Sequence, residues 1–245
     1  PEHTVWLLCA PSPEDMIATI RSRCRHLGLR IPTATAVADL LVREGIATPE
    51  VALEAARAAQ SHIGLARALA RDPQMRERRR SIITAPASVR SVGEAVMAAD
   101  RLLETAKAQA DAQVSDRNAR EKADLLRQLG MEEGESATKA SRTMLRQLEE
   151  DQKRRSKRAL TDAIDRALID LLAIYRDILM VQVGGDGELI NTDLSELVHQ
   201  IAHDSTPHQT LARVDHIETA RKRLVANGNP LLVLEDMAIS LRPQA

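Results

Sequence analysis

The stretch from residue 160 to residue 179, LTDAIDRALIDLLAIYRDIL, carries the strongest structural signal in this chain of 245 residues. Its large apolar side chains recur every three or four residues, so they gather on one face of a helix. These positions are Leu160, Ile164, Leu168, Leu171, Leu172, Tyr175 and Leu179. A stripe of this kind predicts that the helix is buried against other helices, and it indicates a mainly α-helical fold.

A second helical stripe lies upstream and predicts a partner for the first. Its apolar positions are Val92, Ala95, Val96, Ala99, Leu102, Leu103 and Ala106. Beyond these positions large apolar residues are few and charges dominate to about Arg158, with Gly130 and Gly134 interrupting the pattern. We expect two long helices to reverse near these glycines and to form a helical hairpin, whose arm at about residues 108–158 protrudes into solvent.

The residues after this hairpin predict a turn and three more helices. Gly184-Gly185-Asp186-Gly187 ends the second long helix, and no Lys-Ser/Thr helix start follows it as a phosphate-binding loop would require. Helices are expected over residues 193–203, 207–226 and 230–241. Together with the hairpin, these elements indicate one helical domain over residues 86–245.

Residues 32–85 predict a smaller bundle of three short helices and a hinge. The helices are expected to begin at Pro32-Thr33, Thr48-Pro49-Glu50 and Ser61-His62 and to end at Gly45, near Ala59 and at Asp72-Pro73. A threonine cap, a proline at the first position and an early acid favour such helix starts. The charged stretch 74–90, interrupted by Pro86, is expected to form the hinge to the next domain, and a helix over Gln74–Ile83 stays open within it.

The first 31 residues combine an apolar run with a cluster of arginines. Val5–Ala10 is apolar and Pro11-Ser12-Pro13 follows it, a pattern typical of a buried strand that ends in a turn. After a short helical turn comes Thr19-Ile20-Arg21-Ser22-Arg23-Cys24-Arg25. Arg23 lies between two small side chains, so its guanidinium can project, and its planar fork of donors suits a phosphate.

These features resemble the clamp-loader subunits of the AAA+ class, among them most closely the delta-prime type of bacterial DNA polymerase III. The strand, the proline-containing turn and Ser22-Arg23-Cys24 are similar to the end of that family's nucleotide-binding domain. Gly64-Leu65-Ala66-Arg67 is similar to the sensor-2 segment of the lid, and Asn227–Met237 resembles the closing helix of the collar. The three segments keep the family's order and separation, so the resemblance spans nearly the whole chain.

The resemblance implies a division into domains. Residues 1–31 would be the C-terminal part of a AAA+ nucleotide-binding domain. Residues 32–85 would be the lid domain and hinge. Residues 86–245 would form the collar, through which the subunit joins other subunits in a ring, with the hairpin arm at about 108–158.

The resemblance also implies roles for two arginines. Arg23, supported by Ser22 and Cys24, would act in trans as an arginine finger on the nucleotide of a neighbouring subunit. Arg67 would be the remnant of a sensor-2 arginine, or alternatively a structural arginine whose long stem packs on the lid.

This chain is not expected to hydrolyse ATP itself. It contains no Gly-x-x-x-x-Gly-Lys-[Ser/Thr] motif, and no acidic strand end is present to hold magnesium. Cys9-Ala10-Pro11 stands where hydrolysing members of the family carry a polar sensor residue. Because a lone strand cannot satisfy its edges, we also expect the chain to be the C-terminal piece of a longer protein.

The implied function is that of a non-hydrolysing clamp-loader subunit within a DNA polymerase holoenzyme. ATP and Mg²⁺ would be held by the neighbouring subunit, with no cofactor in this chain. Its partners would be subunits of the gamma/tau and delta types and, through the complex, the sliding clamp and primed DNA.

Two other functions stay open at this point. One is the gamma/tau motor subunit of the same complex, which hydrolyses ATP. The other is a helical coiled-coil scaffold without any link to ATP, which the long hairpin favours. An intact phosphate loop in the upstream sequence would support the motor subunit, and a degenerate loop would support the delta-prime type.

Composition excludes several further classes of protein. The net charge is −1, so the chain is not globally basic as many nucleic-acid binders are. No apolar run is long enough for a membrane span and no secretory segment is present, which together indicate a cytoplasmic protein without membrane contact. Cys9 and Cys24 are too few for a disulfide framework, and we expect both to be reduced and packed.

Three local patterns favour ordinary structural roles. The segment from Lys139 to Arg158 carries eight basic and three acidic residues, a composition more typical of a solvated helix than of a nucleic-acid contact. His199 and His203 have zinc-like spacing, but Gln200 replaces the glutamate of a metalloprotease. Trp6 and Tyr175 are the sole aromatic residues, so the chain lacks a platform for stacking bases.

Overall fold

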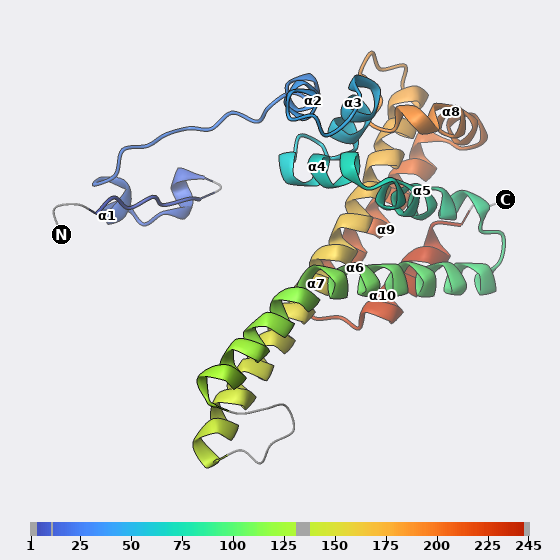
Figure 1. Ribbon diagram of the computed structural model, residues 1–245. Helices are drawn as coiled ribbons and strands as arrows, with labels where there is room; N and C mark the ends of the chain where they lie inside the picture. Colours follow the sequence, from blue (N-terminus) through green and yellow to red (C-terminus); the bar gives the residue numbers. More distant parts are fainter. Residues whose placement is uncertain (1–3, 11, 131–137, 243–245) are drawn as a thin grey trace. The chain divides into compact units, whose positions relative to one another are not determined.

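The computed structural model describes residues 4–10, 12–130 and 138–242, and every regular element within these ranges is helical (Figure 1). This confirms the mainly α-helical fold class. The chain forms two compact units, Pro1–Thr33 and Ala34–Ala245. No helix in the described ranges has the length and apolar character needed to cross a membrane.

The smaller unit contains two short elements, the 3-10 helix η1 (Pro13–Asp15) and helix α1 (Ala18–Arg21). Ser12 caps η1, because its hydroxyl accepts a hydrogen bond from the Glu14 amide and its own amide donates to the Asp15 carboxylate. The expected helical turn after Pro13 is therefore present.

The predicted buried strand at residues 5–10 is wrong. The side chains of Val5, Trp6 and Leu7 are 83%, 79% and 86% exposed, and this segment forms no strand. A strand needs a neighbour to satisfy its backbone groups, and none of the described residues supplies one. For the same reason Cys9 and Cys24 are exposed free thiols rather than packed ones.

Three short helices open the larger unit, as predicted. They are α2 (Ala34–Arg43), α3 (Pro49–Ala58) and α4 (Ile63–Arg71). Their common core consists mainly of alanines, with Val37, Leu41 and Leu69 as its large members. Such small side chains let the helices approach closely. His62 begins α4, where its ring Nδ1 accepts a hydrogen bond from the Leu65 amide at 3.0 Å.

Helix α5 (Pro73–Ser88) continues through the position where a break was expected. Pro86 lies in its last turn, where its missing N–H removes the bond to the Ile82 carbonyl but only two residues of the helix follow it. Arg90 Nη1 donates to the Ala87 carbonyl at 2.7 Å, and the Ser88 hydroxyl donates to the Ala85 carbonyl at 2.8 Å. These bonds satisfy carbonyls that have no partner within the helix.

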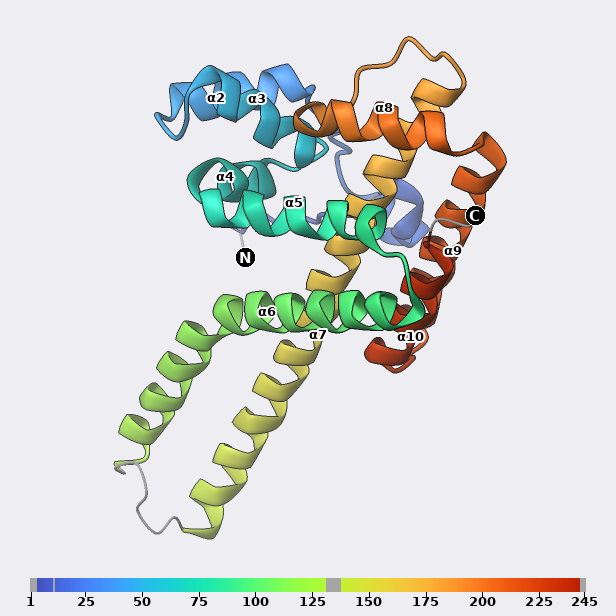
Figure 2. The same cartoon turned by 90° about the vertical axis from the view of Figure 1, so that its right-hand side faces the viewer.

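The two longest helices are α6 (Val92–Gln128) and α7 (Lys139–Gln182), which lie side by side as a hairpin (Figures 1 and 2). Ser91 and Glu94 form a capping box at the start of α6, and the Thr138 hydroxyl caps α7. Gly130 lies just past the end of α6, whereas Gly134 lies outside the described residues.

The predicted turn at residues 184–187 is also confirmed. Gly184 has φ +66°, a conformation that glycine adopts without strain. The Gly185 amide donates to the Met180 carbonyl at 2.9 Å, which closes the C-terminus of α7.

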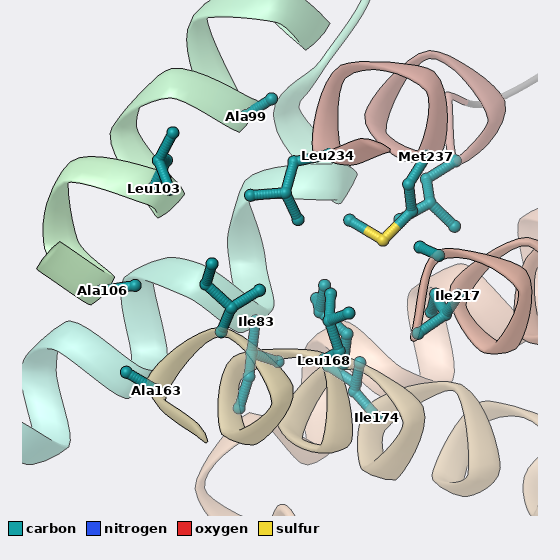
Figure 3. Packing of buried hydrophobic residues seen from close by; sticks show 14 of the residues in the cluster. Ile83, Ala99, Leu103, Ala106, Ala163, Leu168, Ile174, Ile217, Leu234 and Met237 are labelled. Atoms are coloured by element: carbon teal, nitrogen blue, oxygen red, sulfur yellow. The ribbon is translucent and has the colours of Figure 1, made fainter. Parts of the chain in front are cut away.

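Three further helices complete the larger unit, as predicted. After the short 3-10 helix η2 (Thr192–Leu194) come α8 (Ser195–Asp204), α9 (Pro207–Val225) and α10 (Pro230–Ser240). Helix α7 packs against α5, α6, α8 and α9, and α10 packs against α6 and α9. Figure 3 shows the resulting core, in which Leu168 and Ile174 of α7 face side chains such as Ile217, Leu234 and Met237.

Candidate functional site

Arg23 follows α1 in an exposed turn of the smaller unit. The turn is held by its backbone, since the Arg23 amide donates to the Ile20 carbonyl at 3.0 Å. The Ser22 hydroxyl donates to the Thr19 carbonyl at 3.2 Å, and Cys24 is exposed. The Arg23 side chain makes no hydrogen bond or ion pair with the residues that the structure describes. Its guanidinium is therefore available to a ligand outside this unit.

The neighbouring Arg21 differs from Arg23 in this respect. Its Nη1 lies 4.0 Å from Glu14 Oε1, at the limit of an ion pair between exposed side chains. Such a pair contributes little to stability, but it gives the guanidinium a carboxylate within the same unit.

Arg67 belongs to the larger unit, where Glu44 holds it by two hydrogen bonds. Arg67 Nε lies 2.8 Å from Glu44 Oε2, and Nη2 lies 2.5 Å from Oε1. These bonds keep the pKa of the Glu44 carboxyl below its usual value. The Glu44 carboxylate occupies the Nε–Nη2 edge of the guanidinium, where a phosphate would bind. Arg67 of α4 is thereby joined to the residue that follows α2.

A buried polar network that the sequence patterns did not reveal joins α5 to α7. Arg79 Nε donates to Asp170 Oδ1 at 3.0 Å, and its Nη2 donates to Asn191 Oδ1 at 2.6 Å. Burial raises the pKa of the Asp170 carboxyl, and the charge of Arg79 acts in the opposite direction. Burial is the larger of these two influences, so the pKa of Asp170 lies above its usual value although Arg79 stabilises the charged form.

Asp177 extends the same network into the loop after α7. Its carboxylate, which is fully buried, accepts hydrogen bonds from the amides of Ile190 and Asn191 at 3.0 and 2.8 Å. It also accepts from Asn191 Nδ2 and from Arg176 Nη1, each at 2.9 Å. Because this carboxylate is fully satisfied, its role is to fix the loop rather than to perform chemistry.

One sequence signal could have revealed this network. Asp170 and Asp177 are seven residues apart, two helical turns, within the apolar stretch from residue 160 to residue 179. Acids on a buried helix face need cations or amides as partners, and this requirement predicts a network even where the partners are unknown.

Three arginines of the basic segment of α7 form ion pairs within the hairpin or along their own helix. Arg155 bonds both oxygens of Glu121 at 2.8 and 3.1 Å and also Asn118 Oδ1 at 2.7 Å. Arg146 pairs with Glu150, and Arg154 pairs with Asp151. These contacts support the interpretation of the segment as a solvated helix that holds the two arms of the hairpin together.

The two helical histidines lie in ordinary surroundings. His199 and His203 are exposed; His199 Nδ1 lies 2.7 Å from the Ser195 carbonyl, and His203 Nδ1 lies 3.2 Å from Asp204. Across residues 4–10, 12–130 and 138–242, no three His, Cys, Asp or Glu side chains are grouped to hold a metal.

Comparison with known proteins relates part of this chain to a replication protein. A segment of 72 residues, 29% of the chain, is 35% identical to DNA polymerase III subunit delta′ of Bacillus subtilis (strain 168). The segment covers 22% of that protein, so the chain spans about a fifth of this relative's length. No protein-family model matches the chain, and no solved structure matches it.

Proposed function

We propose that this chain is part of a clamp-loader subunit of the delta-prime type. The observation that carries the proposal is the identity of 35% over 72 residues with DNA polymerase III subunit delta′. The helical architecture agrees with it, since a three-helix bundle precedes a larger helical body, in the order that a lid and a collar would have. In this proposal α6 to α10 form the collar that assembles with other subunits.

Arg23 is the residue that acts in this proposal. It projects from an exposed turn between two small residues, and no described side chain neutralises it. A guanidinium in this state can enter a neighbouring subunit and stabilise the charge that develops on a transferring phosphoryl group. Ser22 and Cys24 support it by keeping the turn compact.

The nucleotide and its Mg²⁺ belong to the neighbouring subunit in this proposal. The chain lacks a phosphate-loop motif, and Glu44 occupies the Arg67 guanidinium that a sensor-2 role would require. The partners are subunits of the gamma/tau and delta types, and the assembled complex would load the sliding clamp on primed DNA.

The test uses the full-length protein in a reconstituted clamp-loader complex. Arg23→Ala should leave assembly intact and lower the clamp-dependent ATPase rate by at least about tenfold, since trans-acting arginine fingers contribute about 10³ or more to kcat. Arg23→Lys should fail as well, because a compact ammonium cannot copy the planar fork. Arg25→Ala, a change at an equally exposed neighbour, is the control and should keep the normal rate.

Each other outcome points to a different function. Normal ATPase rates with both Arg23 variants would remove the arginine finger from the proposal. Micromolar binding of ATP to this chain alone, measured by calorimetry with Mg²⁺ present, would favour the motor subunit. A full-length protein that never joins the complex would favour a helical scaffold, for which the long α6–α7 hairpin is the supporting observation.

A further inference from the structure

A cavity of about 550 Å³ lies in the larger unit, among helices that Figure 2 shows around α7. Its walls come from the end of α5, from α7, α8 and α9, and from Leu241 just after α10. Leu197 and Ile201 of α8 supply apolar surface, whereas Arg213 and Tyr175 supply the buried polar groups. Arg67 is not among the residues that line it.

Arg213 is the most unusual residue of this cavity. Its side chain belongs to a residue only 9% exposed, yet it makes no hydrogen bond or ion pair with the described residues. By contrast, Arg79, the other deeply placed arginine, is matched by Asp170 and Asn191. Little of Arg213 is accessible to solvent, and its free donors face the space that it lines.

Tyr175 presents a second unmatched donor to the same space. It is 4% exposed, and its hydroxyl has no hydrogen-bond partner among the described residues. Burial raises the pKa of Tyr175 to about 12, while the charge of Arg213 acts to lower it. The phenol is therefore neutral at physiological pH and can donate its proton in a hydrogen bond.

The rim of the cavity carries one charge of each sign. Arg90 is exposed and uses one nitrogen to cap the Ala87 carbonyl, which leaves its other donors open. Asp204 is also exposed, and it pairs with His203 Nδ1 at 3.2 Å rather than with either arginine. With Arg213 included, the lining is net positive, which favours an anionic ligand.

We propose that this cavity binds an oxyanion, the carboxylate or phosphate group of a small molecule, through Arg213 and Tyr175. The guanidinium fork would hold two oxygens and the phenol would donate to one of them, while Arg90 adds charge at the mouth. The apolar wall of α8 leaves room for the body of the ligand. This site goes beyond the clamp-loader proposal and does not depend on it.

The test uses the whole 245-residue chain, in which Tyr175 is the single tyrosine. Tyrosine labelled with carbon-13 at Cζ alone therefore gives one ring resonance that reports on the cavity. Sodium phosphate and sodium acetate are added in separate titrations at constant ionic strength, with sodium chloride as the reference. We expect a saturable shift of the tyrosine resonance with phosphate, with acetate or with both, and no shift with chloride. The oxyanion that binds more tightly shows whether the natural ligand carries a phosphate or a carboxylate group.

Arg213→Met is the decisive variant, and Arg223→Met is its control. Arg223 lies on the same helix but is exposed and paired with Asp236. We expect Arg213→Met to weaken binding at least tenfold and Arg223→Met to leave it unchanged. The thermal midpoint of the wild type should rise with the bound oxyanion, and that of Arg213→Met should not.

The same measurements can overturn the proposal. The proposal is refuted if neither phosphate nor acetate shifts the tyrosine resonance. It is also refuted if the wild type and Arg213→Met show the same shift. Should Arg213→Met fail to fold, Arg90→Gln replaces it, since that residue is exposed and its change leaves the core untouched. Binding that Arg90→Gln weakens supports the site, and binding that it leaves unchanged contradicts it.

Discussion

At the scale of single residues, two buried aspartates of α7, Asp170 and Asp177, are held in different ways. Asp177 is satisfied by four donors, whereas Asp170 has a single ionic partner, Arg79, at 3.0 Å. The two aspartates therefore differ in how much they depend on one neighbour. Removing Arg79 takes away the hydrogen-bonded cation of a buried carboxylate and leaves Arg166 as the remaining positive charge that acts on it, and such losses are among the largest that a single substitution causes.

We predict that Arg79→Met lowers the free energy of unfolding by about 3 kcal/mol or more at about pH 7. The deficit should shrink as the pH falls below neutral, because burial raises the pKa of Asp170 and the neutral acid is stable inside the core. A group with a raised folded-state pKa stabilises the fold at low pH and loses that contribution as the pH rises. Urea unfolding followed by circular dichroism measures both quantities.

The double variant Arg79→Met/Asp170→Leu is the control for this effect. It removes both charges, so it should be more stable than Arg79→Met alone at neutral pH. A deficit that stays constant with pH, or a double variant weaker than the single one, would contradict the assigned role of Asp170.

Tyr175 yields a second prediction at the residue scale. In the native chain its phenol should ionise at a pH of about 12, and after unfolding in urea it should ionise near the ordinary value of about 10. Folding stability should therefore decline as the pH rises from about 10 towards 12, because the unfolded state gains charge first. Tyrosinate absorbance measures the titration, with circular dichroism to verify that the chain is still folded. Native ionisation near the ordinary value would contradict the burial of this ring.

At the scale of secondary-structure elements, the hairpin consists of two parts with different packing. The apolar core continues along α6 through Ala110 to Val114, which extends contact beyond the start of the expected arm. A polar layer follows, in which Gln152 and Arg155 bond to Asn118 and Glu121. Past this layer, Ser141 is the one buried side chain among the described residues from 122 to 148.

We predict that replacing residues 122–148 by a Gly/Ser linker of about six residues leaves the remaining fold and its stability nearly unchanged. The change retains the Asn118–Arg155 layer, and closing a shorter loop alters the chain entropy only slightly. Thermal unfolding and size-exclusion chromatography check this expectation. Leu168→Ala is the contrasting variant; it empties a fully buried position and should cost about 2–5 kcal/mol. A linker variant less stable than Leu168→Ala would show that the arm contributes to the core.

At the scale of the whole molecule, α7 is the helix around which the larger unit is built. It contacts α5, α6, α8 and α9, and its buried side chains belong to one continuous apolar cluster. A second cluster lies within α2 to α4 and the start of α5. Neither cluster contains a residue that precedes Ala34.

We therefore predict that a chain limited to residues 34–245 folds as the full chain does. Both apolar clusters are retained in it, as is the Arg79–Asp170 network, so its thermal midpoint should match that of the full chain within error. Circular dichroism measures both chains under the same conditions. A clear loss of helicity or of stability would show that residues 1–33 support the larger unit.

Much of this architecture could be predicted from residue spacing. The long helices α6 and α7 and the three helices that follow them have apolar periodicity, and α6 and α7 also have local caps. Both features depend on residues three or four positions apart. The turn after α7 needs Gly184 at positive φ, and the sequence places a glycine there. Two local predictions still failed: the strand at Val5–Ala10 lacks a partner, and Pro86 lies close enough to a helix end to be tolerated.

The candidate sites also differ in whether nearby residues or distant residues determine them. The exposure of Arg23 follows from its short neighbours in a turn, so nearby residues suffice to predict it. The pairing of Asp170 with Arg79 and the meeting of Tyr175 with Arg213 depend on residues 91 and 38 positions apart in the sequence, respectively. Hydrophobic periodicity predicts which face of a helix is buried, but it does not predict which other helix covers that face. The burial of Asp170 and of Arg213 therefore arises from the packing of α5, α8 and α9 on α7, which brings together residues that are far apart in the sequence.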